Sequence, residues 1–540
     1  MYNPVVDRLG QDTQTSRNSV FSRVLSVLRG NATTENLVGL IGALFALFCL
    51  LFLPSSNFWN IRLPLYLVVV IWTLLRPRVA LYLLPVAIPW GSLDTITVGG
   101  LNVNSTDILV ALLTASWLLG FVLRSQGIVG AGPLDHDTHA LPRYLVIAVI
   151  ALLFTMLLST VTALSVRSST KEIIKWVEVL IVVLVGAKYL RTRNQIWTLV
   201  VIIVLAGISQ AFYGYAQNYL NLGPQSFIRD SALRVYGTFG QPNPYAGYIN
   251  MSLPIALSLT LLGHNWATRI PAGIATLLLG FAEYLTKSNG GEIAITVAVL
   301  FVMAVGLLRL RTLFAIGAIG ALAIVAAYLA GVLPQRLIMP ILSKLGLVQL
   351  SFQSPSPQDF STAERLAHWI AGIRMFIDHP FTGVGIGNYS DAYRPYHVTI
   401  FVNSLEHAHN YYINMAAETG IVGLIAFLLF LTAIFVAGVH AYRAISKNYM
   451  QLKAKWTQPR TGTSEAETRN TFRQFGMFTN DRALAIGLLA ALLAVCVHNM
   501  VDNLYVHGLT NLFALLLIAL IRLAKVSQKA VTNGGQRTCL

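Results

Sequence analysis

Charge and cysteine are both scarce in this chain of 540 residues. Only 11% of the residues are Asp, Glu, Lys or Arg, whereas a soluble domain carries about 25%, so the composition excludes a soluble globular protein. Hydrophobic residues make up 55%, which is typical of a polytopic membrane protein. The three cysteines, Cys49, Cys496 and Cys539, are scattered and indicate neither a disulfide framework nor a cysteine-based metal site.

The start of the chain lacks the pattern of a cleavable signal peptide. Residues 1–35 are polar and contain arginines such as Arg8 and Arg29, but they have no apolar core. We therefore expect residues 1–35 to form a cytoplasmic segment. The first membrane span then begins near Asn36 and remains in the membrane.

The apolar runs predict an all-α polytopic membrane protein with about 14 transmembrane helices and one large outer loop. The short runs within 61–91 flank Arg76-Pro77-Arg78 and leave a re-entrant pair open, which would lower the count to about 12. The organisation that we predict is membrane helices at 36–333, the large loop at 334–409, membrane helices at 410–526 with a loop at 441–482, and a tail at 527–540. The individual spans are expected near 36–53, 61–75, 79–91, 107–123, 143–163, 173–187, 195–219, 244–262, 269–286, 292–308, 312–333, 410–440, 483–504 and 508–524.

The distribution of positive charge sets the expected orientation. With a cytoplasmic N-terminus, most of the 38 Lys and Arg residues fall on the cytoplasmic side, as the positive-inside rule requires. Both termini and the 441–482 loop are then cytoplasmic, and the 334–409 loop is on the outer face. The net charge of +16 is therefore a topology signal with some contact to membrane lipid, and we expect no nucleic-acid partner.

The large loop has two recognisable parts after a flexible start. Apolar residues recur at helical spacing in the text ERLAHWIAGIRMFIDHP, which predicts an amphipathic helix that roofs a cavity on the outer face. The glycines at 383, 385 and 387 follow it. A phosphate-cradling loop would need a preceding strand and a following helix, so we favour a sharp structural turn. The apolar face predicted for the helix comprises Leu366, Trp369, Ile370, Ile373, Phe376 and Ile377.

The most informative motif is His409-Asn410, followed after nine residues by Gly420-Ile421-Val422-Gly423. It lies where the polar loop enters an apolar run of about 20 residues. A titratable imidazole at the mouth of a membrane helix is suited to proton transfer, so His409 is a candidate base for an acceptor hydroxyl, with a structural histidine as the alternative. His407 lies two residues away, but a zinc site needs three or four ligands and no Cys- or Glu-rich partner motif is present. We expect no metal and no cofactor.

Positively charged side chains occur at three further places expected on the outer face. Arg229 and Arg234 approach a Gly- and Pro-rich turn, Lys287 follows a membrane span, and Arg365 begins the amphipathic helix. A guanidinium group can donate two parallel hydrogen bonds to phosphate oxygens. The arginines at the turn could instead extend to lipid headgroups. Lys287 is either a second cation near a diphosphate or the i, i+4 partner of Glu283.

Polar residues also recur at the start of the span predicted at 410–440 and near the end of the span predicted at 483–504. Asn410, Asn414 and Glu418 share one helix face, and an ionisable Glu418 beside an apolar run is costly unless it is paired or functional. Gly420 and Gly423 would let another helix approach closely. His498 and Asp502, spaced i, i+4 within the span predicted at 483–504, are expected to form a buried polar pair that supports the site. Further candidates for contact with a substrate are Asn243, Asn410, Tyr411 and Glu418.

Taken together, these segments resemble the O-antigen ligase and polymerase superfamily of membrane glycosyltransferases. The resemblance covers about residues 230–525, and its segments are RVYGTFGQPNPYAGY, LTKSNGG, ERLAHWIAGIRMFIDHPFTGVGIGNY, HAHNYYINMAAETGIVGL and HNMVDNLY. It implies that His409 matches the essential histidine of the family and that Arg234 and Arg365 match arginines that bind the diphosphate. The family often has Ser-Arg-Gly where this chain has Ser288-Asn289-Gly290, so either Lys287 replaces that arginine or the donor is held differently.

The resemblance further implies a multi-pass protein of the bacterial inner membrane that moves a glycan from undecaprenyl diphosphate to an acceptor hydroxyl on the periplasmic face. The reaction would be inverting and metal-independent. A ligase uses lipid A–core as acceptor, a polymerase another glycan, and a third group of relatives a protein. The alternative from a different class is an inorganic-carbon or other small-solute transporter. A transporter would place charged residues near mid-membrane in paired halves, and neither feature is evident here.

Overall fold

The computed structural model describes residues 63–91, 95–98, 101–126, 141–229, 232–307, 352–353, 360–457 and 465–532, with isolated positions between 317 and 322. The predicted span at 36–53, nearly all of that at 312–333, and the segments 1–35 and 533–540 lie outside this part of the chain. The described residues are mostly helical, and several helices are apolar and long, which confirms a helical multi-pass membrane protein.

The chain separates into two compact units. The first unit comprises 1–83 and 111–130, and the second comprises 84–110 and 131–540. The first unit contains α3 (Leu63–Leu75), the start of α4 (Pro77–Trp90) and most of α5 (Ser105–Ser125). A short antiparallel pair, β1 (Thr95–Val98) and β2 (Leu101–Asn104), precedes α5.

The second unit holds the longer helices. A two-residue hairpin, β3 (Ile228–Arg229) with β4 (Ala232–Leu233), lies between two of them. The helices of this unit are α6 (Arg143–Ser159), η4 (Thr160–Thr162), α7 (Val166–Tyr189), α8 (Arg193–Leu220), η5 (Gln225–Phe227), α9 (Pro242–Leu262), α10 (Trp266–Thr286), α11 (Asn289–Gly306), α14 (Phe360–Asp378), α15 (Tyr389–Ala392), α16 (Tyr411–Thr457), α17 (Glu465–His498) and α18 (Leu509–Thr532).

A helix is present at each predicted span that falls within the described residues. Eight of the described helices are long and apolar enough to cross a membrane, so the total of about 14 spans stays a prediction. The short pair α3 and α4 has 13 and 14 residues, or about 20 Å each at 1.5 Å per residue. The description of α3 begins at Leu63, so the re-entrant alternative for 61–91 likewise stays a prediction.

Local sequence explains where several helices start. Ser165, Asn265 and Ser288 each occupy the residue before a helix and accept a backbone N–H of its first turn. Thr192 does the same for α8, and Gln195 reaches back to form a capping box. These caps satisfy donors that the first turn of a helix leaves without partners.

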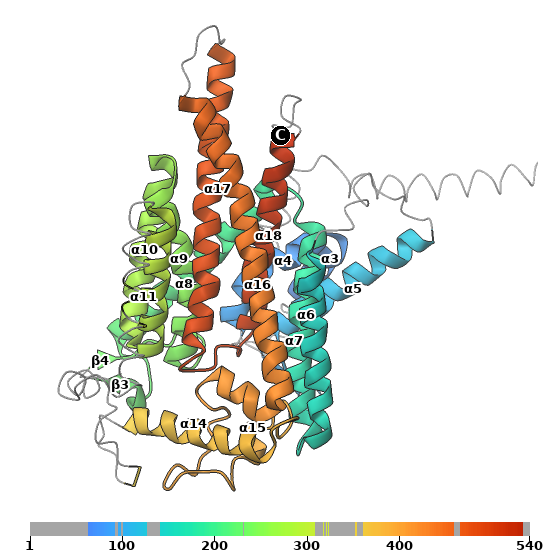
Figure 1. Ribbon diagram of the computed structural model, residues 1–540, viewed down its shortest axis with the longest axis vertical. Helices are drawn as coiled ribbons and strands as arrows, with labels where there is room; N and C mark the ends of the chain where they lie inside the picture. The colour runs from blue at the N-terminus through green and yellow to red at the C-terminus, as the bar shows by residue number, and fades with distance from the viewer. Residues whose placement is uncertain are drawn as a thin grey trace, which may run out of the picture. The chain divides into compact units, whose positions relative to one another are not determined.

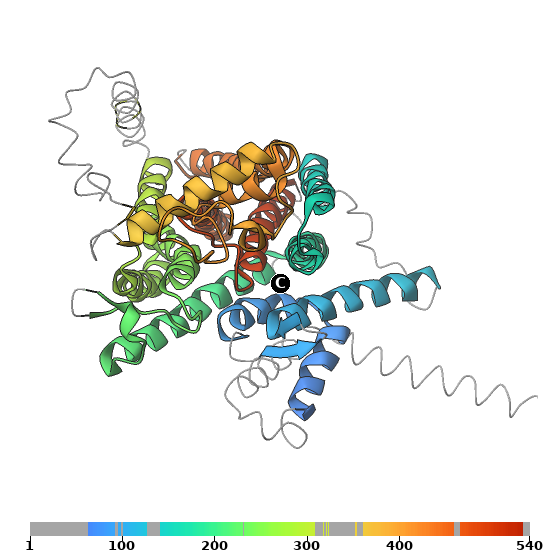
Figure 2. The same ribbon diagram turned by 90° about the horizontal axis from the view of Figure 1, so that it is seen from below.

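Helix α14 lies across one end of the helix bundle. Helix α9 packs against α10 and α17, and α16 packs against α6, α17, α18 and α14. Figure 1 shows α14 lying across the ends of these helices rather than along them, and Figure 2 shows the same arrangement end-on. The starts of α9, α11, α16 and α18 and the ends of α8, α10 and α17 therefore meet at a single end, which we call the α14 end.

The amphipathic helix predicted in the large loop is present as α14, but two of the six residues on its predicted apolar face are exposed. Ile373 is 46% exposed and Ile377 is 65% exposed. Small side chains at helical spacing face inward instead, because they let α14 lie close to the helix ends. The buried residues are Ala363, Ala367, His368, Ala371, Gly372 and Met375.

Glycines make the turn after α14 possible. Gly383 has φ of 67° and Gly420, inside α16, has φ of 63°, a conformation that costs a residue with a Cβ about 1–2 kcal/mol. A Cβ at Gly420 would also lie 2.3 Å from the carbonyl carbon of Phe381. The glycine turn is therefore structural, as predicted. However, a loop approaches Gly420, and not a second helix as expected.

The segment 441–482 was predicted to be a loop, yet most of its described part is helical. Helix α16 continues to Thr457, and α17 begins at Glu465. Charged residues are compatible with a helix that extends beyond the membrane, so polarity marks the end of the apolar run rather than the end of the helix.

Candidate functional site

His409 lies in the turn directly before α16, at the α14 end. Its backbone has a left-handed φ of 51°, and its N–H donates to Nδ1 of His407 at 3.1 Å. Its carbonyl accepts the indole N–H of Trp369 on α14 at 3.2 Å. Asn410 caps α16 by accepting two backbone N–H groups of the first turn. The backbone is thus held on both sides of His409, which fixes the direction of the imidazole.

The imidazole of His409 faces Asp502, which lies in the turn after α17. Nδ1 of His409 and Oδ1 of Asp502 are 3.4 Å apart. Burial raises the pKa of Asp502, but the hydrogen bond and charge of His409, with the charges of His407 and His498, lower this pKa below its usual range. The ionised carboxylate favours the proton of a neutral His409 on Nδ1. Nε2 of His409 then carries a lone pair, and among the described residues it has no hydrogen-bond partner.

A chain of hydrogen bonds connects this His–Asp pair to Arg234. The amide nitrogen of Asn243, at the start of α9, donates to Oδ2 of Asp502. Its amide oxygen accepts from Arg234 at 3.1 Å and from the Ser288 hydroxyl at 2.9 Å. Arg234 also donates through Nε to the Thr286 carbonyl at 3.0 Å. Three elements far apart in the sequence therefore meet at the Asn243 amide, which Asp502 links to the imidazole.

Arg365 reaches the same region from α14. It lies one helical turn before Trp369, so the two side chains share a face, and Trp369 bonds to the His409 carbonyl. The charge of Arg365 is one of the effects that hold down the pKa of His407, after burial and the charge of His409. Nε of Arg365 is buried without a hydrogen-bond partner in the part of the chain that the structure describes. A ligand with oxygen acceptors would satisfy it.

Two further histidines surround His409. The ring centroids of His407 and His409 are 4.5 Å apart, and those of His368 and His409 are 5.6 Å apart. Burial, followed by the charges of neighbouring histidines, lowers the pKa of His368 and of His407 to about 4 each. The sequence-based argument against a metal was that no Cys- or Glu-rich partner motif accompanies the two histidines. In the structure Asp502, which is far away in the sequence, lies beside His407 and His409.

Three of the candidate contacts to substrate also make contacts within the fold, and their contact with a substrate stays a prediction. Asn410 caps α16 and donates to the Met500 carbonyl at 2.7 Å. Tyr411 is 1% exposed and packs in an aromatic cluster with Trp176 and Tyr505. Glu418 is 4% exposed and accepts the backbone N–H at the start of α15 at 3.0 Å. Asn410 and Glu418 thus have structural partners, whereas the buried Tyr411 hydroxyl has no hydrogen-bond partner among the described residues.

Of the two remaining candidate cations, the structure describes all of Lys287 but only the backbone of Arg229. Lys287 ends α10 in a left-handed conformation with φ of 47°, beside the Thr286 carbonyl that holds Arg234. Glu283, the alternative partner of Lys287, accepts a hydrogen bond from Asn250 at 3.1 Å. The backbone of Arg229 belongs to β3, and its side chain lies outside the described residues.

The pairing predicted for His498 and Asp502 was wrong. Helix α17 ends at His498, so the two residues do not share a helix face. Among the described residues, neither ring nitrogen of His498 has a hydrogen-bond partner. Asp502 instead faces His409 and Asn243. The signal that could have revealed this is the sequence Asp502-Asn503, whose side chains compete with helical hydrogen bonds.

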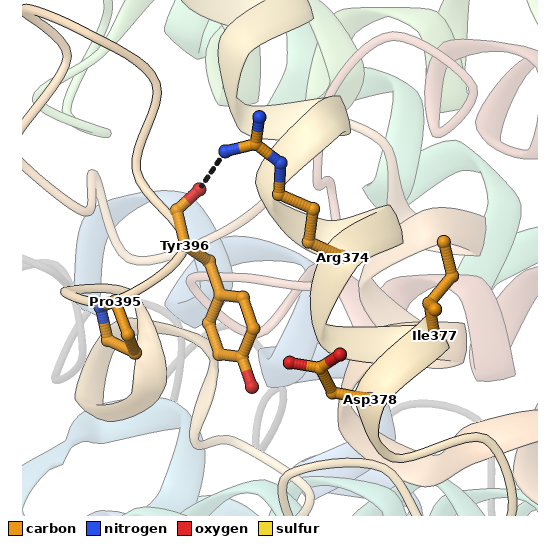
Figure 3. A pocket seen from close by; sticks show the side chains of 5 residues that line it. All are labelled: Arg374, Ile377, Asp378, Pro395 and Tyr396. Carbon is orange, nitrogen blue, oxygen red and sulfur yellow. Dashed lines mark hydrogen bonds between the residues drawn. The ribbon is translucent and has the colours of Figure 1, made fainter.

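A separate pocket lies farther along α14. It has a volume of about 340 Å³ and is lined by Arg374, Ile377, Asp378, Pro395 and Tyr396. Figure 3 shows the Arg374 guanidinium bonded to the Tyr396 carbonyl, at 3.3 Å, with Asp378 on the same helix. None of these residues belongs to the His409 cluster. We therefore centre the candidate site on His409, and not on this open surface pocket.

Comparison with known families gives one match, which covers part of this region. Residues 274–428 match the family model described as O-antigen ligase. The match includes Lys287, Arg365 and His409, and it ends before Asp502. It confirms over this segment the resemblance to the O-antigen ligase and polymerase superfamily, and it supports ligase- or polymerase-type function in general. No curated protein matches the chain.

Proposed function

We propose that this protein transfers a glycan from undecaprenyl diphosphate to an acceptor hydroxyl at the α14 end, which faces the periplasm. The observation that carries the proposal is the connected series His409, Asp502, Asn243 and Arg234. It unites a proton acceptor and a guanidinium group at one end of a membrane bundle. These are the two functions that cleavage of a sugar–diphosphate bond requires.

In the proposed reaction, Nε2 of His409 takes the proton of the acceptor hydroxyl as its oxygen attacks the anomeric carbon. The bond between that carbon and the diphosphate oxygen breaks, and its electron pair goes to the leaving diphosphate. Arg234 and Arg365, with Lys287 nearby, stabilise the developing negative charge. Attack opposite the leaving group inverts the anomeric configuration. No metal takes part in these steps.

A reconstituted reaction tests the proposal. Purified full-length protein, lipid-linked glycan and candidate acceptors are incubated with and without EDTA, and products are resolved by mass spectrometry. We expect transfer with EDTA to be at least as fast as without it. Loss of transfer with EDTA would refute the metal-independent route. Absence of transfer, together with uptake of labelled bicarbonate into proteoliposomes, would support the transporter alternative.

The choice of acceptor separates the members of the superfamily. We favour lipid A–core, which makes the protein a ligase, over a second lipid-linked glycan or a protein. A deletion strain distinguishes these acceptors through its surface glycan. Loss of attachment to lipid A–core indicates a ligase, whereas chains of a single repeat indicate a polymerase.

Arg365→Gln is expected to lower kcat/KM by about 10²–10³-fold, the usual cost of one preorganised donor to a developing anion. Arg365→Lys should recover only part of the loss, because an ammonium group lacks the planar fork. The matched control is Arg374→Gln on the same helix, whose guanidinium bonds to backbone carbonyls of another loop. Equal losses in Arg365→Gln and Arg374→Gln would contradict the assignment. Initial rates over a range of donor concentrations provide the measurement.

A further inference from the structure

The cluster of His407, His409 and Asp502 has the donors of a transition-metal site. Each residue offers one ligand atom, and the three atoms lie within 4.8 Å of one another. Two imidazoles and a carboxylate are the protein ligands of many zinc sites that keep one position open. The cluster joins a turn before α16 to a turn after α17, so the fold itself brings the three ligands together.

The spacing within the His–Asp pair, long for a charge-assisted hydrogen bond, also fits two ligands of one metal ion. Charge-assisted N–H···O bonds have a donor–acceptor distance of about 2.7–2.9 Å, whereas Nδ1 of His409 and Oδ1 of Asp502 are 3.4 Å apart. Two ligands of a tetrahedral zinc ion, each about 2.0–2.1 Å from the metal, are separated by about 3.3–3.4 Å. The two atoms therefore have the separation of neighbouring zinc ligands.

The surroundings provide support and access. The His409 carbonyl accepts from Trp369 and its N–H donates to His407, so the ligand-bearing turn is held in place. Asn243 donates to the second carboxylate oxygen of Asp502, which is the outer hydrogen bond that orients a ligating carboxylate. The His409 side chain is 17% exposed, so the His–Asp pair is not sealed from solvent.

We propose that His407, His409 and Asp502 bind Zn²⁺ and that the bound ion switches glycan transfer off. The inhibitory consequence rests on the proposed function, whereas the binding site does not. Zinc takes the lone pair of Nδ1 of His409, so the single proton of the neutral imidazole must reside on Nε2. Nε2 then has no lone pair for the acceptor proton, and the proposed base is disabled. Zinc removal restores the tautomer that Asp502 favours.

Binding is tested directly with ZnCl₂ and the detergent-purified full chain by isothermal titration calorimetry, and with CoCl₂ by visible absorption. We expect one high-affinity ion per chain and the absorption of tetrahedral Co²⁺. His407→Gln should raise the Kd for Zn²⁺ by more than about tenfold, since even partners outside the ligand set account for 10–100-fold. The exposed His379→Gln is the matched control and should keep the wild-type Kd. Asp502→Asn should lose binding as His407→Gln does, and elution as a single species in size-exclusion chromatography shows that each variant is folded.

Inhibition is measured as the ratio of transfer rates with and without Zn²⁺ within each variant, which removes any difference in basal rate. At a free Zn²⁺ concentration ten times the Kd, the wild-type rate should fall to about one tenth by mass action. The ratio should stay near one in His407→Gln. Equal Kd values for wild type, His407→Gln and Asp502→Asn would refute the site. Zinc binding without loss of wild-type transfer would refute the switch. Failure of the proposed function is recognised separately, because transfer is then absent without Zn²⁺ while the binding data stand.

Discussion

His409→Ala is expected to lower kcat for glycan transfer by about 10²–10⁴-fold, the range that a positioned general base contributes. The structure gives this residue an imidazole whose Nδ1 faces a carboxylate and whose Nε2 has no hydrogen-bond partner among the described residues. Its removal leaves the arginines that we propose to bind the diphosphate. Donor affinity should therefore change much less than kcat. Initial rates with purified protein, lipid-linked donor and acceptor provide both values.

Stability has to be separated from catalysis in this test. The left-handed φ of 51° at His409 penalises alanine but is tolerated by asparagine, so His409→Asn keeps the turn and removes the base. Both variants should lose transfer to a similar extent. His379→Ala, an exposed histidine on the same loop, should transfer normally. Transfer by His409→Asn at more than about a tenth of the wild-type rate would show that the imidazole is not the base.

The sequence predicted the parts of this site that depend on local pattern. Polar residues at the mouth of an apolar run located His409 and the start of α16, and helical spacing located α14 and Arg365. These features follow from hydrophobicity and helix periodicity, which short stretches of sequence contain. Which face of α14 packs against the rest of the protein could not be predicted in this way. Periodicity shows that Ile373 and Ile377 share a face, but it does not show which neighbours that face meets.

Asp502 shows why the rest of the site could not be predicted. Apolar composition extended the predicted span to 504, whereas α17 ends at His498. Past this point, the side chains of Asn499 and Asn503 accept the N–H groups of Leu504 and Tyr505, and such local bonds end a helix. The turn then carries Asp502 to His409. That contact joins residues far apart in sequence and depends on how α16 and α17 pack.

The hydrogen-bond partners of polar residues could not be predicted from the sequence either. Glu418 next to an apolar run indicated either function or pairing, and only the fold shows that it holds the start of α15. Asn243 was one of several candidates for contact with a diphosphate or glycan. In the structure it is the link between Arg234 and Asp502. An amide can donate and accept at the same time, which suits it to connect a guanidinium to a carboxylate.

Asp502→Asn is expected to lower kcat about as much as His409→Ala does, by about 10²–10⁴-fold. Because the pKa of Asp502 lies below its usual range, the wild-type side chain is an anion throughout the neutral range and accepts the Nδ1 proton. An asparagine can keep its oxygen toward Asn243, and its amide nitrogen then faces His409 as a donor. The imidazole must accept this bond at Nδ1 and move its proton to Nε2, where the base is needed.

A double-mutant cycle distinguishes this orienting role from general damage to the fold. If Asp502 acts through His409, the variant with both His409→Ala and Asp502→Asn should be no slower than His409→Ala alone, because residues that act as a unit are strongly non-additive. The exposed Asp378→Asn on α14 is the control and should leave kcat unchanged. Losses that multiply in the double variant would mean that Asp502 acts independently of the imidazole. Since Asp502 also meets Arg234 through Asn243, a rise in KM for the donor with unchanged kcat would assign it to donor binding instead.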